Sequence, residues 1–216
     1  MSRSTVVTAG AVMRHTGRVA LTESARRPVG LPITFLVTGI IGLIASLALT
    51  LDKIALLENP NAQLACNFSV LVGCSDNLNS AQGSVFGFPN PILGIVFWSA
   101  VITAGVGMLA GARFAGWFWV LFGIGTAAAL ALVVWFISQS VFVLRVLCPW
   151  CMVTWAVTIP VFFVVVLHTL RSEWVPAPIR KVASAGFFWI PIATLLCYVI
   201  VAVLAQVQLD VLSEFF

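Results

Sequence analysis

Five long runs of uncharged, mostly apolar residues divide this chain, and they constrain its fold more than any other feature. Each run has roughly the ~20 residues that a helix needs to cross ~30 Å of hydrocarbon. The runs cover about 31–52, 91–110, 117–140, 148–170 and 186–208. They are continuous rather than alternating, which favours helices over a barrel. Only 8% of the residues are charged, so the chain is predicted to be an all-α integral membrane protein with lipid as its main solvent.

The positions of the basic residues predict the orientation of these spans. If the N-terminus is cytoplasmic, all Lys and Arg residues except Lys53 and Arg145 lie inside. Residues 1–30 are then a cytoplasmic tail, and the loop 57–90 is extracytoplasmic. Residues 171–216 form a cytoplasmic loop and the fifth span, which brings the C-terminus outside. The expected location is the plasma or inner membrane of the cell, crossed several times.

The extracytoplasmic loop is long for a segment without a clear helix or strand pattern, and such loops are commonly functional. Its glycines and prolines argue against one continuous helix. Within it, 77–84 is predicted to form a short surface helix, and 85–88 to dip into the membrane interface. The loop also holds Cys66 and Cys74.

The motif Cys148-Pro149-Trp150-Cys151 stands at the predicted start of the fourth span, on the same outer side as the loop. A C-x-x-C pair at a helix start places both sulfurs on one face, at a spacing that can close a disulfide. Proline suits the first helical turn, so Cys148 is expected at the helix N-terminus, where partial positive charge stabilises a thiolate. Cys151 lies one turn deeper, where an apolar electron acceptor can reach it. The motif therefore predicts thiol–disulfide redox chemistry.

Two other roles are open to this motif. A C-x-x-C pair is often half of a zinc site, but the chain has no second such pair, and His15 and His168 both map to the cytoplasmic side. A structural disulfide between Cys148 and Cys151 is the other alternative, although so short a loop stabilises little. We favour redox exchange and expect no metal.

The three remaining cysteines are interpreted from their surroundings. Cys66 and Cys74, taken alone, would most often form a structural loop disulfide. Beside a second pair on the same face, they are interpreted as a mobile dithiol that collects electrons outside and delivers them to the C-x-x-C pair. Cys197 falls in the middle of the fifth span, where a small buried hydrophobic side chain is the expected role.

The order of these motifs resembles that of the bacterial homologues of vitamin K epoxide reductase, over about residues 32–168. The markers are Cys66-x7-Cys74, Ser80, Phe86-Gly87, Asn90-Pro91-Ile92-Leu93-Gly94 and Cys148-Pro149-Trp150-Cys151. In the other quinone-linked family of disulfide-forming proteins the C-x-x-C pair comes first, whereas here the wider pair does. The resemblance implies a four-helix catalytic bundle at 31–170 around a quinone, with the fifth transmembrane helix peripheral.

The resemblance also implies an enzyme, a quinone-dependent thiol–disulfide oxidoreductase that supports disulfide formation. A thioredoxin-fold, DsbA-like extracytoplasmic protein would be oxidised by the loop pair, through Cys66. Cys74 would exchange with Cys148, and Cys151 would reduce a quinone of the menaquinone or ubiquinone type. Because this chain stops at Phe216 without a fused thioredoxin-like domain, the partner is expected to be a separate protein.

Five further residues are candidates for the quinone site. The resemblance implies that Ser80 lies in the short loop helix that positions the cysteines, and that Asn90 donates a hydrogen bond to a quinone carbonyl. As an Asn before Pro, Asn90 is also well suited to cap the second span. Many family members carry a tyrosine against the quinone where this chain has Trp155, whose indole can still donate and stack. Phe86 and Phe97 are further candidates, although aromatic residues in membrane helices are often plain packing or interface anchors.

A non-enzymatic transporter or scaffold with structural outer disulfides is the alternative function. Against a transporter, no predicted span carries a charged residue in its interior, where ion and proton paths commonly place one. A scaffold would have no need of a C-x-x-C pair beside the bilayer. Neither basic-aromatic interleaving nor zinc-finger spacing points to nucleic acid. The expected partners are therefore the thioredoxin-fold protein, a quinone and the lipid bilayer.

Overall fold

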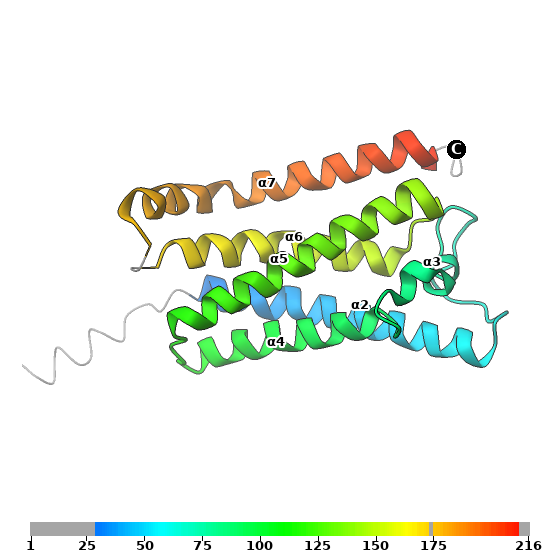
Figure 1. Cartoon of the computed structure of the whole chain (residues 1–216), viewed down its shortest axis with the longest axis horizontal. Helices are drawn as coiled ribbons and strands as arrows, with labels where there is room; N and C mark the ends of the chain where they lie inside the picture. Colours follow the sequence, from blue (N-terminus) through cyan, green and yellow to red (C-terminus); the bar gives the residue numbers. More distant parts are fainter. Residues whose placement is uncertain (1–28, 173–174, 212–216) are drawn as a thin grey trace, which may run out of the picture.

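The computed structural model describes residues 29–172 and 175–211, and within them the protein is mostly helical (Figure 1). The helices are, in chain order, α2 (Gly30–Glu58), α3 (Ser75–Asn79), the 3-10 helix η1 (Ala81–Ser84), α4 (Pro91–Leu109), α5 (Gly116–Ser138), the π-helix η2 (Gln139–Leu144), α6 (Pro149–Leu170) and α7 (Ala177–Leu209). The described residues contain no strand, only one isolated β-bridge. Of the predicted tail 1–30, residues 1–28 lie outside the described ranges.

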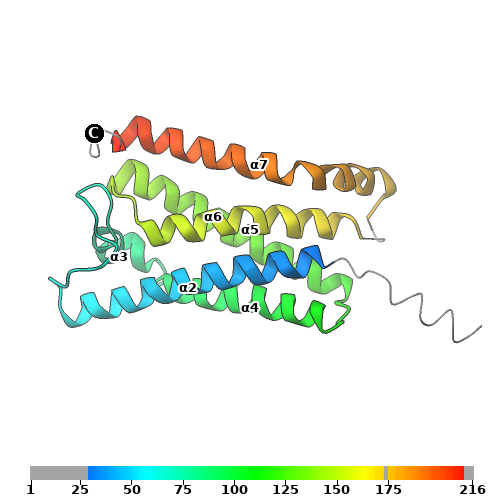
Figure 2. The ribbon, with the colours of Figure 1, turned by 180° about the vertical axis from the view of Figure 1, so that it is seen from behind.

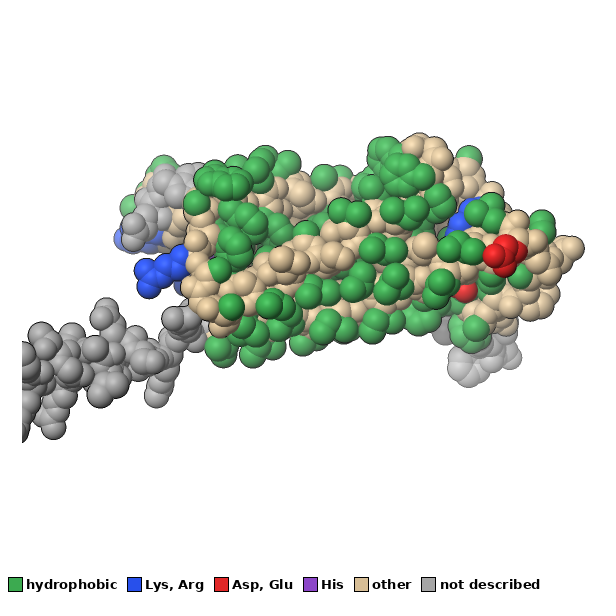
Figure 3. Space-filling view, turned by 90° about the horizontal axis from the view of Figure 1, so that it is seen from below, with side chains coloured by type: hydrophobic (Ala, Val, Ile, Leu, Met, Phe, Trp, Pro, Cys, Tyr) green, Lys and Arg blue, Asp and Glu red, His purple; other side chains and the backbone are tan. Residues whose placement is uncertain are grey.

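Five of these helices are long and apolar enough to cross a membrane: α2, α4, α5 with its π-helical extension, α6 and α7. Apolar side chains cover much of their outward surface, and charged side chains gather near the two ends of the molecule (Figure 3). So much exposed apolar surface is unfavourable in water, whereas lipid tails solvate it well. The predicted all-α membrane fold is confirmed.

Four helices form a bundle, and the fifth lies beside it (Figure 1, Figure 2). α2 packs against α4 and α6, and α5 packs against α6, whereas α7 contacts α6 and the π-helix η2. Large side chains that are almost fully buried in the core of the bundle include Phe35, Trp98, Val101, Val161 and Val165. Gly42 lets α2 approach α4 closely, because a Cβ there would come within 2.1 Å of the Trp98 ring. Most of α7 is exposed, so it is the peripheral helix that the sequence predicts.

Charged residues mark the ends of the apolar runs but not the ends of the helices. α2 continues from the predicted limit near 52 to Glu58, because burial of Leu56 against the outer loop stabilises another turn. α7 begins at Ala177 instead of about 186, with Arg180 near its start. A helix can extend beyond the hydrocarbon into the headgroup region, which the charge pattern alone does not reveal.

A proline inside α6 creates the docking point for α7. Pro160 has no N–H, so the Ala156 carbonyl one turn earlier loses its helical partner. The Tyr198 hydroxyl of α7 donates a hydrogen bond to that carbonyl. Further along, Leu209 of α7 and Trp155 of α6 belong to one buried cluster. α7 therefore supports the half of α6 that begins with the C-x-x-C motif.

Candidate active site

The start of α6 has the geometry expected of a reactive cysteine. Cys148 is the N-cap residue and Pro149 follows it in the first helical turn, as the sequence predicts. The backbone N–H of Cys151 donates to the Cys148 sulfur over 3.4 Å. Hydrogen bonds lower the pKa of the Cys148 thiol. The Cys151 thiol contributes most, the N–H groups of Cys151 and Trp150 add to it, and burial and the Asp52 carboxylate oppose it. Cys148 is therefore well suited to carry a thiolate.

The loop pair is oxidised in this structure. Cys66 and Cys74 form a disulfide, and both residues are buried. The loop between them is held by its own hydrogen bonds. Asn67 Oδ1 accepts from the Cys74 N–H (2.8 Å), and the Phe68 N–H donates to the Val72 carbonyl (2.9 Å). The C-x-x-C pair, in contrast, consists of two free thiols.

The two pairs meet at Cys74 and Cys148, whose Sγ atoms lie 3.4 Å apart. A short piece of parallel β-pairing aligns them. The Gly73 N–H donates to the Leu147 carbonyl (3.0 Å), and the Leu147 N–H donates to the Leu71 carbonyl (2.8 Å). Because Gly73 and Leu147 each directly precede a cysteine of the contact, this pairing fixes how the sulfurs approach. Sulfurs this close can undergo thiol–disulfide exchange with little movement.

Hydrogen bonds of Asn77 fix the loop to η2 and to the segment that follows it. Asn77 of α3 donates from Nδ2 to the Val146 carbonyl (3.2 Å) and accepts at Oδ1 from the Ser140 hydroxyl (3.1 Å). Ser140 lies in the π-helix η2, and the chain leaves that helix through Arg145 in the left-handed conformation, with φ 56°. Nothing in the sequence singled out Asn77, because a lone Asn in a loop belongs to no motif.

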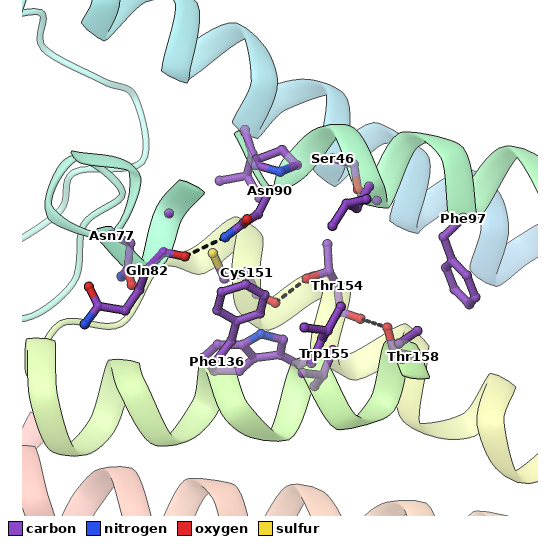
Figure 4. Close-up of a pocket in the computed structure, with 18 of the residues that line it drawn as sticks. Ser46, Asn77, Gln82, Asn90, Phe97, Phe136, Cys151, Thr154, Trp155 and Thr158 are labelled. Carbon is purple, nitrogen blue, oxygen red and sulfur yellow. Dashed lines mark hydrogen bonds between the residues drawn. The ribbon is translucent and has the colours of Figure 1, made fainter. Parts of the chain in front are cut away.

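A cavity of about 410 Å³ opens beside Cys151 (Figure 4). Asn90, Phe97 and Trp155, three of the predicted quinone contacts, line it. In Figure 4 the Cys151 sulfur and the Asn90 amide lie toward one end of the cavity, and Phe97 lies toward the other. Most of the lining is apolar, with a few polar groups such as Gln82. Such a size and lining are typical of a small-molecule site.

Asn90 precedes α4, but its side chain does not cap the helix. Its backbone is already helical (φ −57°, ψ −31°), whereas a capping Asn is extended, so the amide turns back to the loop. Oδ1 accepts from the Val85 N–H (3.1 Å), and Nδ2 donates to the Gln82 carbonyl. The predicted side-chain cap is therefore wrong. The second Nδ2 hydrogen has no partner among the described residues, so it can serve a ligand in the cavity.

Ser80 and Phe86 do not line the cavity. The Ser80 hydroxyl donates to the carbonyl three residues earlier (2.7 Å) and accepts from the Gly83 N–H (3.2 Å), so it caps η1. The helix predicted at 77–84 is broken here, because Ser80 is extended (ψ 158°) and separates α3 from η1. Phe86 is 54% exposed and stacks with Phe88, which suits an interface contact better than a cavity wall.

Asp52, which belongs to no sequence motif, lies against the loop pair. Its Oδ2 atom is 3.4 Å from the Cys66 sulfur. Within the described residues, Asp52, Cys66 and Cys74 form the one group of three potential metal ligands, with ligand atoms within 4.8 Å of one another. Both sulfurs are bonded in the disulfide, so this redox state offers a metal only the carboxylate, well short of the four ligands of a structural zinc site.

Residues 33–166 match the model of the vitamin K epoxide reductase family. The chain belongs to this family. No curated protein matches it. The matched stretch runs from the first turn of α2 almost to the end of α6 and contains both cysteine pairs. Members of the vitamin K epoxide reductase family are membrane disulfide-bond oxidoreductases, so the resemblance and the expectation of an oxidoreductase are confirmed.

α7 lies beyond the part of the chain that matches the vitamin K epoxide reductase family. It carries Cys197, a free thiol of intermediate exposure, so the prediction of a small buried side chain is only partly right. Cys197 does not line the cavity beside Cys151. It therefore has no place in the site formed by the two pairs.

Proposed function

We propose that this protein oxidises the dithiol of a separate extracytoplasmic thioredoxin-fold protein and passes the electrons through its two cysteine pairs to a quinone. The contact between Cys74 and Cys148, at 3.4 Å, carries this proposal, because it joins the loop pair to the pair beside the cavity. Family membership supports disulfide redox chemistry.

The first exchange reduces the loop disulfide. A partner thiolate attacks the Cys66 sulfur, the Cys66–Cys74 bond breaks, and its electron pair leaves on Cys74. The second partner thiol then attacks the partner sulfur bound to Cys66, which releases an oxidised partner and the Cys66 thiolate. Both loop sulfurs are buried in the structure, while Phe68 and Val70 between them are 70% and 82% exposed, so the loop must shift before a partner reaches Cys66.

The second exchange passes the electrons to an oxidised Cys148–Cys151 pair. The Cys74 thiolate attacks Cys148, Cys151 leaves as a thiolate, and a transient Cys74–Cys148 disulfide forms. Cys66 then attacks Cys74, and Cys148 leaves as a thiolate. The hydrogen bonds that lower the pKa of Cys148 make it a good leaving group. Cys148 and Cys151 each take up a proton from water, to which the two partner thiols have released theirs. The product has an oxidised loop pair and a reduced C-x-x-C pair, which is the arrangement of the sulfurs in the structure.

The residues around the cavity fit a quinone headgroup. Cys151 stands in the wall of an apolar cavity of about 410 Å³, and one amide hydrogen of Asn90 is unused. When bound, a quinone of the menaquinone or ubiquinone type supplies an acceptor for two electrons and two protons. Cys148 and Cys151 give up two electrons and two protons when they form their disulfide. Asn90 would orient a carbonyl group, and Trp155 and Phe97 would exclude water.

We further propose that this chemistry takes place on the extracytoplasmic face of the cell membrane, with the N-terminus cytoplasmic and the C-terminus outside. Only Lys53 and Arg145, of the basic residues in the described ranges, lie at the end of the bundle that carries the cysteine pairs. The opposite end carries Arg113, Arg171, Arg180 and Lys181. Basic residues concentrate on the cytoplasmic side of membrane proteins, which supports this orientation.

The test of the proposed function is quinone-dependent oxidation of a reduced thioredoxin-fold protein by the purified protein in liposomes. Wild type and Cys197→Ala are expected to turn over at similar rates, because Cys197 lies outside the cavity. Cys151→Ala should stop turnover, because it removes the sulfur in the cavity wall. If Cys151→Ala keeps the wild-type rate, or wild type shows no response to quinone, the proposed electron path is wrong.

A further inference from the structure

Asp52 lies on the face of α2 that covers the loop pair. Leu49 and Leu56, three residues before it and four after it, share that helical face and belong to the same buried cluster as Cys66 and Cys74. Asp52 itself is half-buried, and its Oδ2 atom lies 3.4 Å from the Cys66 Sγ. A carboxylate is thus held in contact with a reacting sulfur.

No basic side chain pairs with this carboxylate in the described ranges of the chain. Lys53, the next residue of α2, donates instead to the Leu78 carbonyl (2.8 Å) and to Asn79 Oδ1 (3.3 Å). Among the elements packed at this end of α2, α4 has no ionisable side chain, α3 has Asp76, and the start of α6 brings the two thiols of the C-x-x-C pair. An unpaired carboxylate beside a cysteine can take up and return a proton.

Cys66 needs such a group because it loses and regains a proton in every cycle of the proposed reaction. A thiol ionises near pH ~8.5, so only a few per cent is thiolate at about pH 7. Cys148 has N–H donors at the start of α6 that favour its thiolate. No N–H group of the described residues donates to the Cys66 sulfur, whose polar contact is the Asp52 carboxylate.

We propose that Asp52 is the general base and acid for Cys66, an inference that rests on the proposed function. When Cys66 attacks Cys74, its S–H proton passes to the Asp52 carboxylate, the Cys66–Cys74 bond forms, the Cys74–Cys148 bond breaks, and the electron pair leaves on Cys148. When the oxidised partner later leaves Cys66, the Asp52 carboxyl group returns a proton to the Cys66 thiolate. One carboxyl group therefore serves both exchanges and ends each cycle in its starting protonation state.

A carboxylate that acted only through its charge would have the opposite effect. Negative charge beside a cysteine disfavours the thiolate, as Asp52 already does at Cys148, where it opposes the lowering of the pKa. Under that role, Asp52→Asn would speed the formation of the Cys66–Cys74 disulfide. If Asp52 is the base, the same substitution slows it. The direction of the rate change therefore distinguishes the two roles.

The experiment follows a single oxidation of the fully reduced protein by a water-soluble quinone at several pH values. Samples are quenched in acid, alkylated and analysed by mass spectrometry, which reports the two disulfides separately. In Asp52→Asn, we expect the Cys148–Cys151 disulfide to form at least as fast as in wild type, and the Cys66–Cys74 disulfide to form about 100-fold more slowly near neutral pH. The difference between the rates of Asp52→Asn and wild type should become smaller above pH ~8.5, where a thiol ionises without a base. Asp52→Glu should recover part of the rate.

Glu58→Gln is the matched control, because it removes a carboxylate from the exposed end of the same helix. It should leave the formation of both disulfides at the wild-type rate. If neither disulfide forms in wild type, the proposed function is overturned, and the role of Asp52 with it. If the Cys148–Cys151 disulfide forms normally but Asp52→Asn leaves the loop disulfide unchanged, faster, or slowed equally at every pH, Asp52 is not the base.

Discussion

The Sγ atoms of Cys74 and Cys148 lie 3.4 Å apart, although the two residues are 74 positions apart in the chain. Three features hold them together: the pairing of Val72 with Leu147, the hydrogen bonds of Asn77 to η2 and the segment after it, and the helix that begins directly after Cys148. None of these features uses the loop disulfide. The alignment of the two pairs should therefore persist when their redox states change.

Asn77→Ala should slow electron transfer between the pairs and leave the chemistry at the cavity intact. It removes hydrogen bonds to Val146 and Ser140, each worth roughly 1 kcal/mol, and so loosens the loop against η2 and the segment after it. We expect the Cys66–Cys74 disulfide to form roughly 10-fold more slowly after mixing with quinone, by the same mass-spectrometric measurement. Asn61→Ala, at an exposed position of the same outer loop, is the control. Equal slowing in the two variants would contradict a specific role for Asn77.

Asn90→Leu should weaken quinone binding. It removes the unused amide hydrogen of a residue that lines the cavity and also the hydrogen bonds to Val85 and Gln82. Loss of one hydrogen bond of roughly 1.4 kcal/mol raises the KM for quinone about 10-fold. Steady-state rates at varied quinone concentration measure this, with the exposed Asn61→Leu as control. An unchanged KM in Asn90→Leu would exclude the contact.

Cys151→Ala should raise the pKa of Cys148, because the Cys151 thiol is the main cause of its lowering. A thiolate is populated above its pKa, so the protein that keeps Cys151 should hold the Cys148 thiolate down to a lower pH than the variant. The measurement is the ultraviolet absorbance of the thiolate in a pH titration, with Cys66, Cys74 and Cys197 replaced by Ala in both proteins. Coincident titration curves would show that the hydrogen bond does not set this pKa.

Tyr198→Phe should destabilise the protein by about 1 kcal/mol, because the Ala156 carbonyl left free by Pro160 loses its donor. In a Pro160→Ala background the N–H of residue 160 can donate to that carbonyl, so Tyr198→Phe should destabilise the protein less. Thermal unfolding in detergent of the four proteins completes the double-mutant cycle. If Tyr198→Phe lowers the free energy of unfolding equally in both backgrounds, the Tyr198 hydroxyl does not replace the N–H that Pro160 lacks.

Much of the fold follows from properties that are local in the sequence. The apolar runs depend only on neighbouring residues, and so does the placement of Cys148 at a helix start ahead of Pro149. Helix ends were less predictable, because burial of Leu56 under the outer loop extends α2 past its charged residues. The extra turn could not be foreseen without knowing where the loop lies.

The parts of the site that escaped prediction depend on tertiary structure. Asp52 meets Cys66 only because the loop folds back onto α2, 14 residues later in the chain. The Asn90 amide turns toward the loop because its backbone is already helical, which no residue preference reveals. That Cys66, Cys74, Cys148 and Cys151 lie at the same end of the bundle could be predicted, since this depends on motif spacing and the order of the spans rather than on packing.

The most direct test of the proposed electron path is to trap the bond between the pairs. The variant Cys66→Ala with Cys151→Ala removes the two sulfurs that would otherwise resolve this bond, leaving Cys74 and Cys148 in contact. Mild oxidation followed by proteolysis and mass spectrometry then reports which peptides are linked. The 3.4 Å contact predicts a Cys74–Cys148 disulfide as the main product. If both cysteines instead remain free to react with an alkylating reagent after oxidation, electrons do not pass between the pairs by this path.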